Sequence, residues 1–525
     1  MALNRKEGLV LGSLTLLALA LRLWRLDYFE IWVDEGATWL FARNLLTGGL
    51  GDLTLEPTPP VYYALVSLFV GLLGDSDWVL RLPGVLFGTA TVPAVYFLGR
   101  RFFGVRAGTL AAILLTIHPL HIFYSREARV YPLLLLLAVL WLHALGRALD
   151  LDTRRAWAQF GLVLGLACAV HITGLFLGFA SGALILALAP TNRVRWRGLL
   201  ASALVGLCLA PWFVWTLPRL GDSGAAWIVE YFYQQYPEDQ ELGRVLEQTL
   251  FGADHPPYMR QMSQPSTPPL WRALGLLTQG ALLLLAVSFA WGRESQRWTW
   301  LLFGGWLLPI LVPWGLSHGW RPFFQSGRHD VYALGAVVGL LAVGVEALWQ
   351  KRGTMPALMA VLVVLGLAGW RLQAFQEHPP GGVWRATGAW LGEQATAEDL
   401  VIATGVQRLA AERYVRLAGS EVPIQSFPAS TDEHPGWSDV QTLMADQEAL
   451  HREGRDTVAG LEARRVFVLL QTYESRDGAV SATWLVDRHL MENLWASGWR
   501  QENDPQAEAL NIAIFQPPNR EVTSP

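Results

Sequence analysis

The chain has 525 residues, of which 52% are hydrophobic and only 16% are charged, with a formal net charge of -4. Soluble domains average about 25% charged residues, so this composition argues against a soluble protein. No block of basic residues stands out from the loops, which argues against a nucleic-acid partner. The two cysteines, Cys168 and Cys208, both lie in apolar runs, which excludes a thiolate metal cluster.

Long apolar runs recur up to residue 375. A membrane helix needs about 20 mostly apolar residues. Eleven runs approach that length, at 8–24, 79–99, 107–124, 131–149, 155–171, 173–189, 197–217, 270–291, 298–316, 329–348 and 355–375. The first run is interpreted as an uncleaved span, because no small-residue cleavage site follows it. These runs predict an all-α polytopic membrane protein with about 11 transmembrane helices.

A shorter apolar stretch at 60–74 suits a re-entrant or interfacial helix as well as a span. If it does not cross and the N-terminus is cytoplasmic, every cytoplasmic loop carries Arg or Lys, as the positive-inside rule requires. If it does cross, Arg100, Arg101, Arg154 and Arg155 move outside. The first topology is therefore preferred. It places these segments outside, together with the C-terminal tail: 25–78, 125–130, 218–269 and 317–328.

The tail from residue 376 loses the long apolar runs and becomes charged. Strands alternating with helices predict a small α/β domain there. Short β-like runs occur at Val401–Thr404, Val466–Leu470 and Ile512–Phe515, and helix-like stretches at about 406–418, 439–453 and 484–497. The expected organisation is a transmembrane domain over 1–375, with a catalytic outer loop at 25–78, and an extracytoplasmic α/β domain over 376–525.

Two adjacent carboxylates, Asp34 and Glu35, follow the first span. One interpretation is a solvated acidic tip of the first outer loop. The other is a catalytic base at the membrane surface, where carboxylates are costly unless they have a function. Transfer of a glycosyl group to a hydroxyl needs a carboxylate that accepts the hydroxyl proton. Spacing alone leaves both interpretations open.

Arginines gather at the outer mouths of the predicted helices. Arg81 begins one span, Arg126 and Arg129 lie in a short loop between two spans, and Arg328 precedes a late span. A single arginine of this kind can snorkel to lipid headgroups. Together with Arg321 they break the positive-inside trend on one face, and such charges usually line a site. Arginine forks bind phosphate well, so a lipid phosphate is the expected ligand.

The ordered set of motifs resembles the GT-C glycosyltransferases, specifically bacterial relatives of dolichyl-phosphate-mannose protein mannosyltransferases and of lipid A aminoarabinose transferases. The resemblance covers about residues 8–350. Each motif is weak, whereas their order is fairly specific. The motifs are Asp34-Glu35, Pro59-Pro-Val-Tyr-Tyr63, Leu80-Arg-Leu-Pro83, Tyr124-Ser-Arg-Glu-Ala-Arg-Val-Tyr131 and Arg328 before a late span.

The resemblance implies an inverting transfer from a polyprenyl-phosphate sugar. Asp34 would be the base, with Glu35 supporting it. The donor phosphate would bind Arg81, Arg126, Arg129 and Arg328. The candidate substrate-binding side chains are Tyr63, Tyr131 and His329.

The chain departs from its relatives where many have His-Pro-Pro or Glu-Lys-Pro and this sequence reads Thr58-Pro-Pro60. Compared with those relatives, this chain lacks a lysine or histidine contact there, so phosphate binding would depend more on the arginines. Metal dependence varies across the superfamily, which leaves a divalent metal open. No convincing metal ligand set is visible, and no other cofactor is expected. For His118 and His121, capping or an interfacial position is favoured over metal binding.

The predicted function is a cell-envelope hexosyl- or pentosyltransferase. It would move a sugar from a polyprenyl-phosphate donor to a protein, lipid or cell-surface glycan on the extracytoplasmic face. The main alternative is a polytopic transporter or flippase of a lipid-linked substrate. Transporters tend to show inverted repeats and ionisable residues at the bilayer midplane. Here no repeat is apparent and the charges lie at outer helix ends. A non-catalytic scaffold that displays the tail is a third alternative.

Overall fold

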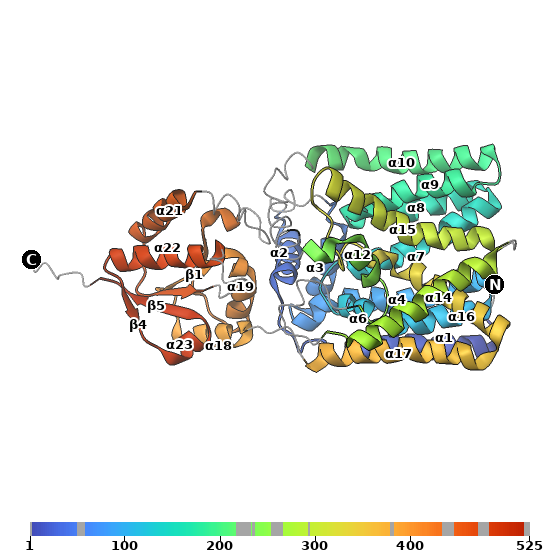
Figure 1. Cartoon of the computed structure of the whole chain (residues 1–525). Coiled ribbons are helices and arrows are strands. Elements are labelled where there is room, and N and C mark those ends of the chain that lie inside the picture. The colour runs from blue at the N-terminus through green and yellow to red at the C-terminus, as the bar shows by residue number, and fades with distance from the viewer. Residues whose placement is uncertain are drawn as a thin grey trace, which may run out of the picture. The chain divides into compact units, whose positions relative to one another are not determined.

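A computed structural model of the chain describes residues 3–49, 58–216, 233, 237–253, 266–291, 295–377, 383–432, 446–470 and 482–518. The chain divides into two compact units, which are described separately (Figure 1). The membrane unit comprises Met1–Tyr28, Leu45–Leu220 and Phe232–Pro380. The C-terminal unit comprises Phe29–Asn44, Gly221–Tyr231 and Gly381–Pro525.

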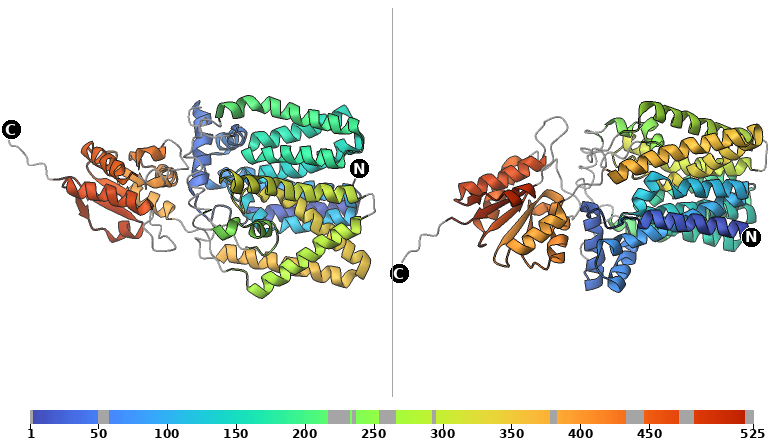
Figure 2. Two further views of the ribbon diagram at one scale, coloured as in Figure 1. Left: turned by 45° about the horizontal axis from the view of Figure 1, so that its top comes forward. Right: turned by 90° about the horizontal axis from the view of Figure 1, so that it is seen from below.

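The membrane unit is helical, and Figure 2 shows its long helices running side by side. Its helices are α1 (Arg5–Leu23), α3 (Val61–Leu73), α4 (Asp77–Phe103), α5 (Val105–Thr116), α6 (Pro119–Ser125), α7 (Tyr131–Leu151), α8 (Arg154–Val170), α9 (Leu175–Leu188), α10 (Asn192–Thr216), α12 (Leu242–Gln248), α14 (Pro269–Ala290), α15 (Gln296–Gly319), α16 (Leu334–Arg352) and α17 (Thr354–Glu377). Short 3-10 turns occur at Ile172–Gly174, Pro237–Gln240 and Val331–Ala333.

Each of the eleven apolar runs coincides with helix, but the predicted number of spans is not confirmed. Among the described residues, seven helices are long and apolar enough to cross a membrane, or eight if α5 and α6 form one bent span. The bend between α5 and α6 is 61°, and it falls at Pro119, which lacks the backbone N–H that would continue α5. Helices α8 and α9 have only 17 and 14 residues, and α1 carries charges at both ends. The ambiguous stretch at 60–74 is the short apolar helix α3.

Glycines let the membrane helices approach closely. A Cβ atom on Gly99 of α4 would lie 2.8 Å from the Cα of Gly108 in α5. A Cβ on Gly344 of α16 would lie 2.1 Å from the carbonyl oxygen of Leu282 in α14. Small residues at such crossings replace side-chain bulk with backbone contact, which is the usual way in which membrane helices associate.

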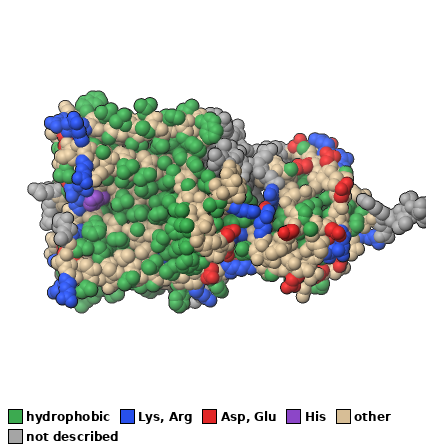
Figure 3. Space-filling view, turned by 180° about the vertical axis from the view of Figure 1, so that it is seen from behind, with side chains coloured by type: hydrophobic (Ala, Val, Ile, Leu, Met, Phe, Trp, Pro, Cys, Tyr) green, Lys and Arg blue, Asp and Glu red, His purple; other side chains and the backbone are tan. Residues whose placement is uncertain are grey.

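Ion pairs tie together the loops that were predicted to be cytoplasmic. Asp150 pairs with both Arg101 and Arg297, at 3.0 and 3.2 Å. Arg100 pairs with Glu7 at 2.9 Å. In the space-filling view, hydrophobic side chains cover the flank of the helical unit and Lys and Arg side chains gather at one of its ends (Figure 3). Which face of the membrane this end occupies stays a prediction.

The C-terminal unit contains a five-stranded mixed sheet in the order β2-β1-β3-β5-β4. β1 runs parallel to β2 and β3, whereas β5 is antiparallel to β3 and β4. The strands are β1 (Leu400–Thr404), β2 (Ile424–Phe427), β3 (Val466–Leu469), β4 (Arg500–Glu502) and β5 (Ile512–Gln516). The three β-like runs of the sequence are β1, β3 and β5, so the predicted small α/β domain is confirmed in its fold.

Helices cover both faces of this sheet. Alternate strand residues face opposite sides, so Val401 and Phe467 belong to one core and Ile402 and Val468 to the other. The first core packs against α18 (Trp384–Gln394), α19 (Arg408–Leu417) and α23 (Pro505–Ala509). The second core packs against α21 (Gln447–Ala459) and α22 (Ala482–Ala496). The helix predicted at 439–453 begins only at Gln447, and residues 439–445 lie outside the described ranges.

The segment after the first helix, which was predicted as an outer loop, contains a helix of its own. Residues Val33–Thr47 form helix α2, and Asp34 and Glu35 lie in its first turn. Acidic side chains are favourable there because the N-terminal end of a helix carries partial positive charge. The interpretation of the Asp34-Glu35 pair as a solvated loop tip is therefore wrong for Glu35, which is only 1% exposed.

Candidate functional site

The motif from Tyr124 to Tyr131 joins two helices of the membrane unit. Pro119 opens α6 and Pro132 lies in the first turn of α7, where proline is tolerated because the N–H of that position has no intrahelical partner. The backbone between these helices lies directly on α4. A Cβ on Gly84 would stand 2.8 Å from the carbonyl oxygen of Glu127, and a Cβ on Gly88 would overlap the Ser125 hydroxyl. The glycine of the Leu-Arg-Leu-Pro-Gly motif is therefore needed for close approach.

Arg328 and Tyr131 come together from distant parts of the chain. The Arg328 guanidinium donates through Nε to the Tyr131 hydroxyl, and its Cζ lies 5.6 Å from the centre of the Tyr131 ring. The Cζ of Arg129 is 6.0 Å from the same ring. Both Arg328 and Tyr131 are buried, at 7% and 3% exposure. Two predicted phosphate ligands thus flank one predicted substrate-binding residue.

Two histidines extend this cluster. The ring of His171 lies 5.7 Å from that of Tyr131 and 5.8 Å from that of His329. His171 follows α8, and its Nδ1 is 2.7 Å from the Thr173 hydroxyl. The structure therefore places the predicted His329 beside the predicted Tyr131, with His171 between them. We name Arg129, Tyr131, His171, Arg328 and His329 the Arg–Tyr–His cluster.

The loop that carries Arg328 is held by hydrogen bonds to both sides. The Tyr124 hydroxyl donates to the carbonyl oxygen of Gly327 over 2.6 Å. The N–H of Gly327 donates to Asp330 Oδ2 over 2.9 Å. Gly327 has a φ of 74°, which favours glycine. Asp330 is fully buried, so this carboxylate is part of the fixed loop and does not face solvent.

Arg81 and Arg126 form a second group of cations. Arg81 Nη1 donates to the carbonyl of Leu26 over 2.9 Å, and Arg126 Nη2 donates to the carbonyl of Arg25 over 3.0 Å. Burial, and then the neighbouring charges of Arg81 and Arg25, lower the pKa of Arg126 to about 10. It remains charged at neutral pH. Buried like charges repel one another, so this arrangement favours a bound anion.

Tyr63, the remaining predicted substrate-binding residue, lies in the first turn of α3 and is buried. Its ring packs edge-on against that of Tyr62, at 6.1 Å between centroids. Of the two histidines considered for metal binding, His121 instead contacts Arg22, whose Nη2 is 2.9 Å from His121 Nδ1. Arg22 is completely buried in α1.

The predicted catalytic carboxylates belong to the other unit. Helix α2 packs on α19 at Gly36, where a Cβ would lie 3.0 Å from the Leu409 Cβ. Trp39, 2% exposed, lies with its ring 5.5 Å from the Cζ of buried Arg413. The contacts fix the first turn of α2, and therefore Asp34, on the C-terminal fold.

Two further contacts hold the segment before α2. The N–H groups of Trp384 and Arg385 donate to the Glu30 carboxylate, over 2.7 and 3.0 Å. Glu30 thereby caps the N-terminus of α18, since the first N–H groups of a helix have no intrahelical partner. The Tyr414 hydroxyl accepts the N–H of Ile31 over 2.8 Å.

Sequence reasoning missed several residues that the structure adds. His171 was placed inside a span, and the only signal for it was a polar residue between two apolar runs. Tyr414 and Arg413 lie more than 360 residues after α2 along the chain, and no local pattern links them to this segment. The structure brings Arg129, Tyr131, Arg328 and His329 together, and it assigns Asp34 and Glu35 to a different unit.

Comparison with known proteins identifies the fold. Residues 57–215 match the family model described as dolichyl-phosphate-mannose-protein mannosyltransferase. ArnT from Cupriavidus metallidurans bound to undecaprenyl phosphate is 13% identical, with a TM-score of 0.57 and 97% of each chain covered. The apo Archaeoglobus fulgidus oligosaccharyltransferase is 14% identical, with a TM-score of 0.57, covering 99% of this chain and 75% of that one. Among the curated proteins no match is found.

A third structure is oligosaccharyltransferase AglB from Archaeoglobus fulgidus in complex with an inhibitory peptide and a dolichol-phosphate. It is 13% identical, has a TM-score of 0.54, and covers 99% of this chain and 75% of that one. At these identities the likeness concerns the fold. The family match over residues 57–215 and the similarity of the fold agree with the class predicted from the sequence, the GT-C membrane glycosyltransferases.

Proposed function

We propose that this glycosyltransferase moves a sugar from a polyprenyl-phosphate donor to an acceptor hydroxyl on the extracytoplasmic face of the membrane. The observation that carries the proposal is the Arg–Tyr–His cluster, in which Arg129 and Arg328 flank Tyr131 at the ends of apolar helices. Arginine side chains gathered at that depth attract anions. A lipid-linked phosphate has both the charge and the location to bind there. Undecaprenyl phosphate and dolichol-phosphate bound to the related structures support this donor class.

In the proposed reaction the arginines stabilise the leaving group. The bond between the anomeric carbon and the phosphate oxygen breaks, and the lipid phosphate leaves with the electron pair. Arg328, Arg129, Arg126 and Arg81 are assigned to this phosphate. Bidentate guanidinium–phosphate contacts are strong and directional, and they act best where negative charge develops in the transition state.

Asp34 is assigned to the acceptor. Its carboxylate takes the proton of the acceptor hydroxyl while the hydroxyl oxygen attacks the anomeric carbon from the side opposite the phosphate. The anomeric configuration is therefore inverted. Glu35, which is buried next to it, is assigned to positioning Asp34. Tyr63, Tyr131 and His329 are assigned to substrate binding, and the acceptor class comprises proteins, lipids and surface glycans.

Residues 1–375 are assigned to the transmembrane glycosyltransferase domain with its catalytic segment at 25–78, and 376–525 to an extracytoplasmic α/β domain. Within that catalytic segment, Phe29–Asn44 belong to the same compact unit as the α/β domain. The N-terminus is placed in the cytoplasm. Epitope tags at residues 103 and 195 would then be protected in intact cells and a tag at residue 450 would be accessible, whereas accessibility at residue 103 rejects this topology.

The function is tested with purified full-length protein in proteoliposomes. A panel of synthetic polyprenyl-phosphate hexoses and pentoses, labelled in the sugar, is the donor set. Transfer of label from at least one donor to an extracted envelope fraction, with release of polyprenyl phosphate, supports the proposal. Absence of transfer from every donor by folded protein, combined with uptake or flipping of the lipid, supports a transporter instead.

A further inference from the structure

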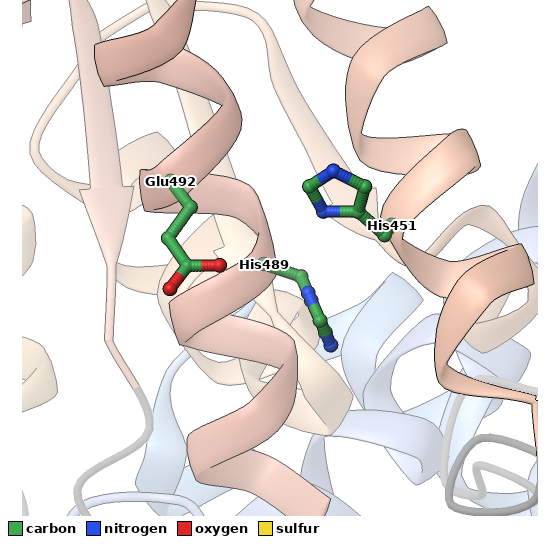
Figure 4. Close-up of side chains that lie close together, drawn as sticks. All are labelled: His451, His489 and Glu492. Atoms are coloured by element: carbon green, nitrogen blue, oxygen red, sulfur yellow. The ribbon is translucent and has the colours of Figure 1, made fainter.

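Three potential metal ligands meet on the sheet face covered by α21 and α22, in the C-terminal unit. His451 comes from α21, and His489 and Glu492 come from α22 (Figure 4). One nitrogen or oxygen of each lies within 4.8 Å of the others. The two imidazole rings stand 5.4 Å apart in an edge-to-face arrangement. None of these residues belongs to the groups assigned to sugar transfer.

The spacing on α22 places two of the ligands on one helix face. His489 and Glu492 are three residues apart, and residues at that separation are neighbours on a helix surface. Figure 4 shows His451 approaching from the adjacent helix at the same level. A His–Glu pair on one turn and a histidine from a neighbouring helix is a donor set that suits a borderline divalent ion such as Zn²⁺.

The two helices are held close at this level by Gly454 and Asn493. A Cβ on Gly454 would lie 2.8 Å from Asn493 Nδ2, so α21 approaches α22 where it has no side chain. The buried Asn493 carboxamide donates to the carbonyl of His489 over 2.7 Å and to that of His451 over 3.2 Å. One side chain therefore fixes the backbone of both histidines, which is the supporting role that outer residues play around a metal.

The surroundings of the His489 imidazole indicate that a ligand binds there. Both of its ring nitrogens are shielded from solvent and have no hydrogen-bond partner among the described residues. A buried polar atom without a partner is uncommon in folded proteins and calls for a bound ion, a water or a functional explanation. A metal bound to one nitrogen would satisfy the requirement at this ring.

We propose that His451, His489 and Glu492 bind one Zn²⁺-class ion, with water as a further ligand, and that this ion clips α21 to α22. Tetrahedral zinc with bonds of about 2.0–2.1 Å needs ligand atoms about 3.4 Å apart. Since these atoms lie within 4.8 Å of one another, they close by at most about 1.4 Å on binding, which side-chain rotation supplies. Glu492 accepts from Arg488 through Oε1 at 2.6 Å, so binding of the metal through that oxygen would open this ion pair. Both partners are substantially exposed, and an exposed pair contributes little to stability.

The experiment uses the full-length protein in detergent after treatment with a chelator. Zn²⁺ is titrated by calorimetry, and the melting temperature is recorded with and without Zn²⁺. We expect one saturable site and a rise in melting temperature, because a ligand that binds only the folded state stabilises it. His451→Ala, His489→Ala and Glu492→Gln should each weaken the affinity by at least about tenfold.

Glu448→Gln is the matched control. Glu448 lies on α21 and pairs with Arg452 at the same four-residue spacing as Glu492 and Arg488. It should bind Zn²⁺ as the wild type does. The melting temperature of each variant in chelator shows whether it folds. The proposal is overturned if the wild type shows no saturable binding, or if folded His451→Ala and His489→Ala proteins bind Zn²⁺ with unchanged affinity.

Discussion

The proposed donor-binding and catalytic residues differ in what holds them in place. The Arg–Tyr–His cluster is built entirely by the membrane unit, from the ends of α7 and α8 and the loop before α16. Asp34 is carried by α2, which is fixed by α18 and α19 of the C-terminal unit. In the proposed reaction, donor binding and proton transfer thus depend on different parts of the fold. Mutations in the two units should therefore damage different steps of the reaction.

The largest effect is expected for Asp34→Asn. The substitution keeps the size of the side chain but removes the charge and the proton acceptor. General-base catalysis typically contributes about 10²–10⁴-fold, so transfer should fall by at least 10²-fold while donor binding is retained. The measurement is transfer of labelled sugar, normalised to folded protein. Asp27→Asn is the control, since Asp27 is exposed and belongs to the membrane unit. Glu35→Gln should be milder than Asp34→Asn.

Arg328→Ala should act on the donor instead. It removes a buried guanidinium, and a hydrogen bond to a charged group contributes about 1.5–3 kcal/mol. We expect the KM for a polyprenyl-phosphate sugar to rise about 10- to 100-fold. Lysine at this position should recover only part of the loss, because its ammonium group keeps the charge but cannot make the paired hydrogen bonds of a guanidinium. Wild-type kinetics over a full donor titration of the alanine variant would place the phosphate elsewhere.

Gly36→Val tests whether the position of α2 affects sugar transfer when Asp34 itself is unchanged. Its Cβ would lie 3.0 Å from that of Leu409, and the branched side chain would push α2 away from α19. Small displacements of a catalytic group are costly, so we expect transfer to fall by about tenfold with little change in KM. Gly12→Val in α1 is the matched control, because a Cβ there meets no atom within 4 Å. Equal activity of the two variants would mean that the packing of α2 on α19 does not matter for transfer.

The smallest effect concerns the stability of the C-terminal unit. Burial tends to raise the pKa of Asp399, but hydrogen bonds from Arg465 and Thr396 and the Arg465 charge outweigh it and lower the pKa below the ordinary 3.8. A carboxyl with a lowered folded pKa stabilises the protein above its unfolded pKa, and this contribution is lost as the pH falls through the folded value. Asp399→Asn should therefore lower the melting temperature at pH 7, and the difference should shrink below about pH 4. A difference that stays constant down to pH 3 contradicts this assignment.

The sequence was most informative where local pattern and environment coincide. Cations beside apolar runs singled out Arg129 and Arg328, and short β-like runs identified β1, β3 and β5. The sequence did not predict features that depend on packing between residues far apart in the chain. Nothing near Asp34 shows that the segment before it caps α18 through Glu30 or that its helix packs on Leu409. The number of spans stays a prediction, because short apolar helices such as α9 cannot be told from full spans by composition alone.

The most direct test of the account measures donor binding and sugar transfer separately in the same two variants. Binding of a labelled polyprenyl-phosphate sugar and its transfer are compared for Asp34→Asn and Arg328→Ala in proteoliposomes. The account predicts that Asp34→Asn binds the donor as the wild type does but does not transfer the sugar, whereas Arg328→Ala binds weakly and regains transfer at high donor concentration. Full transfer by Asp34→Asn, or donor binding that is unchanged in Arg328→Ala, contradicts it.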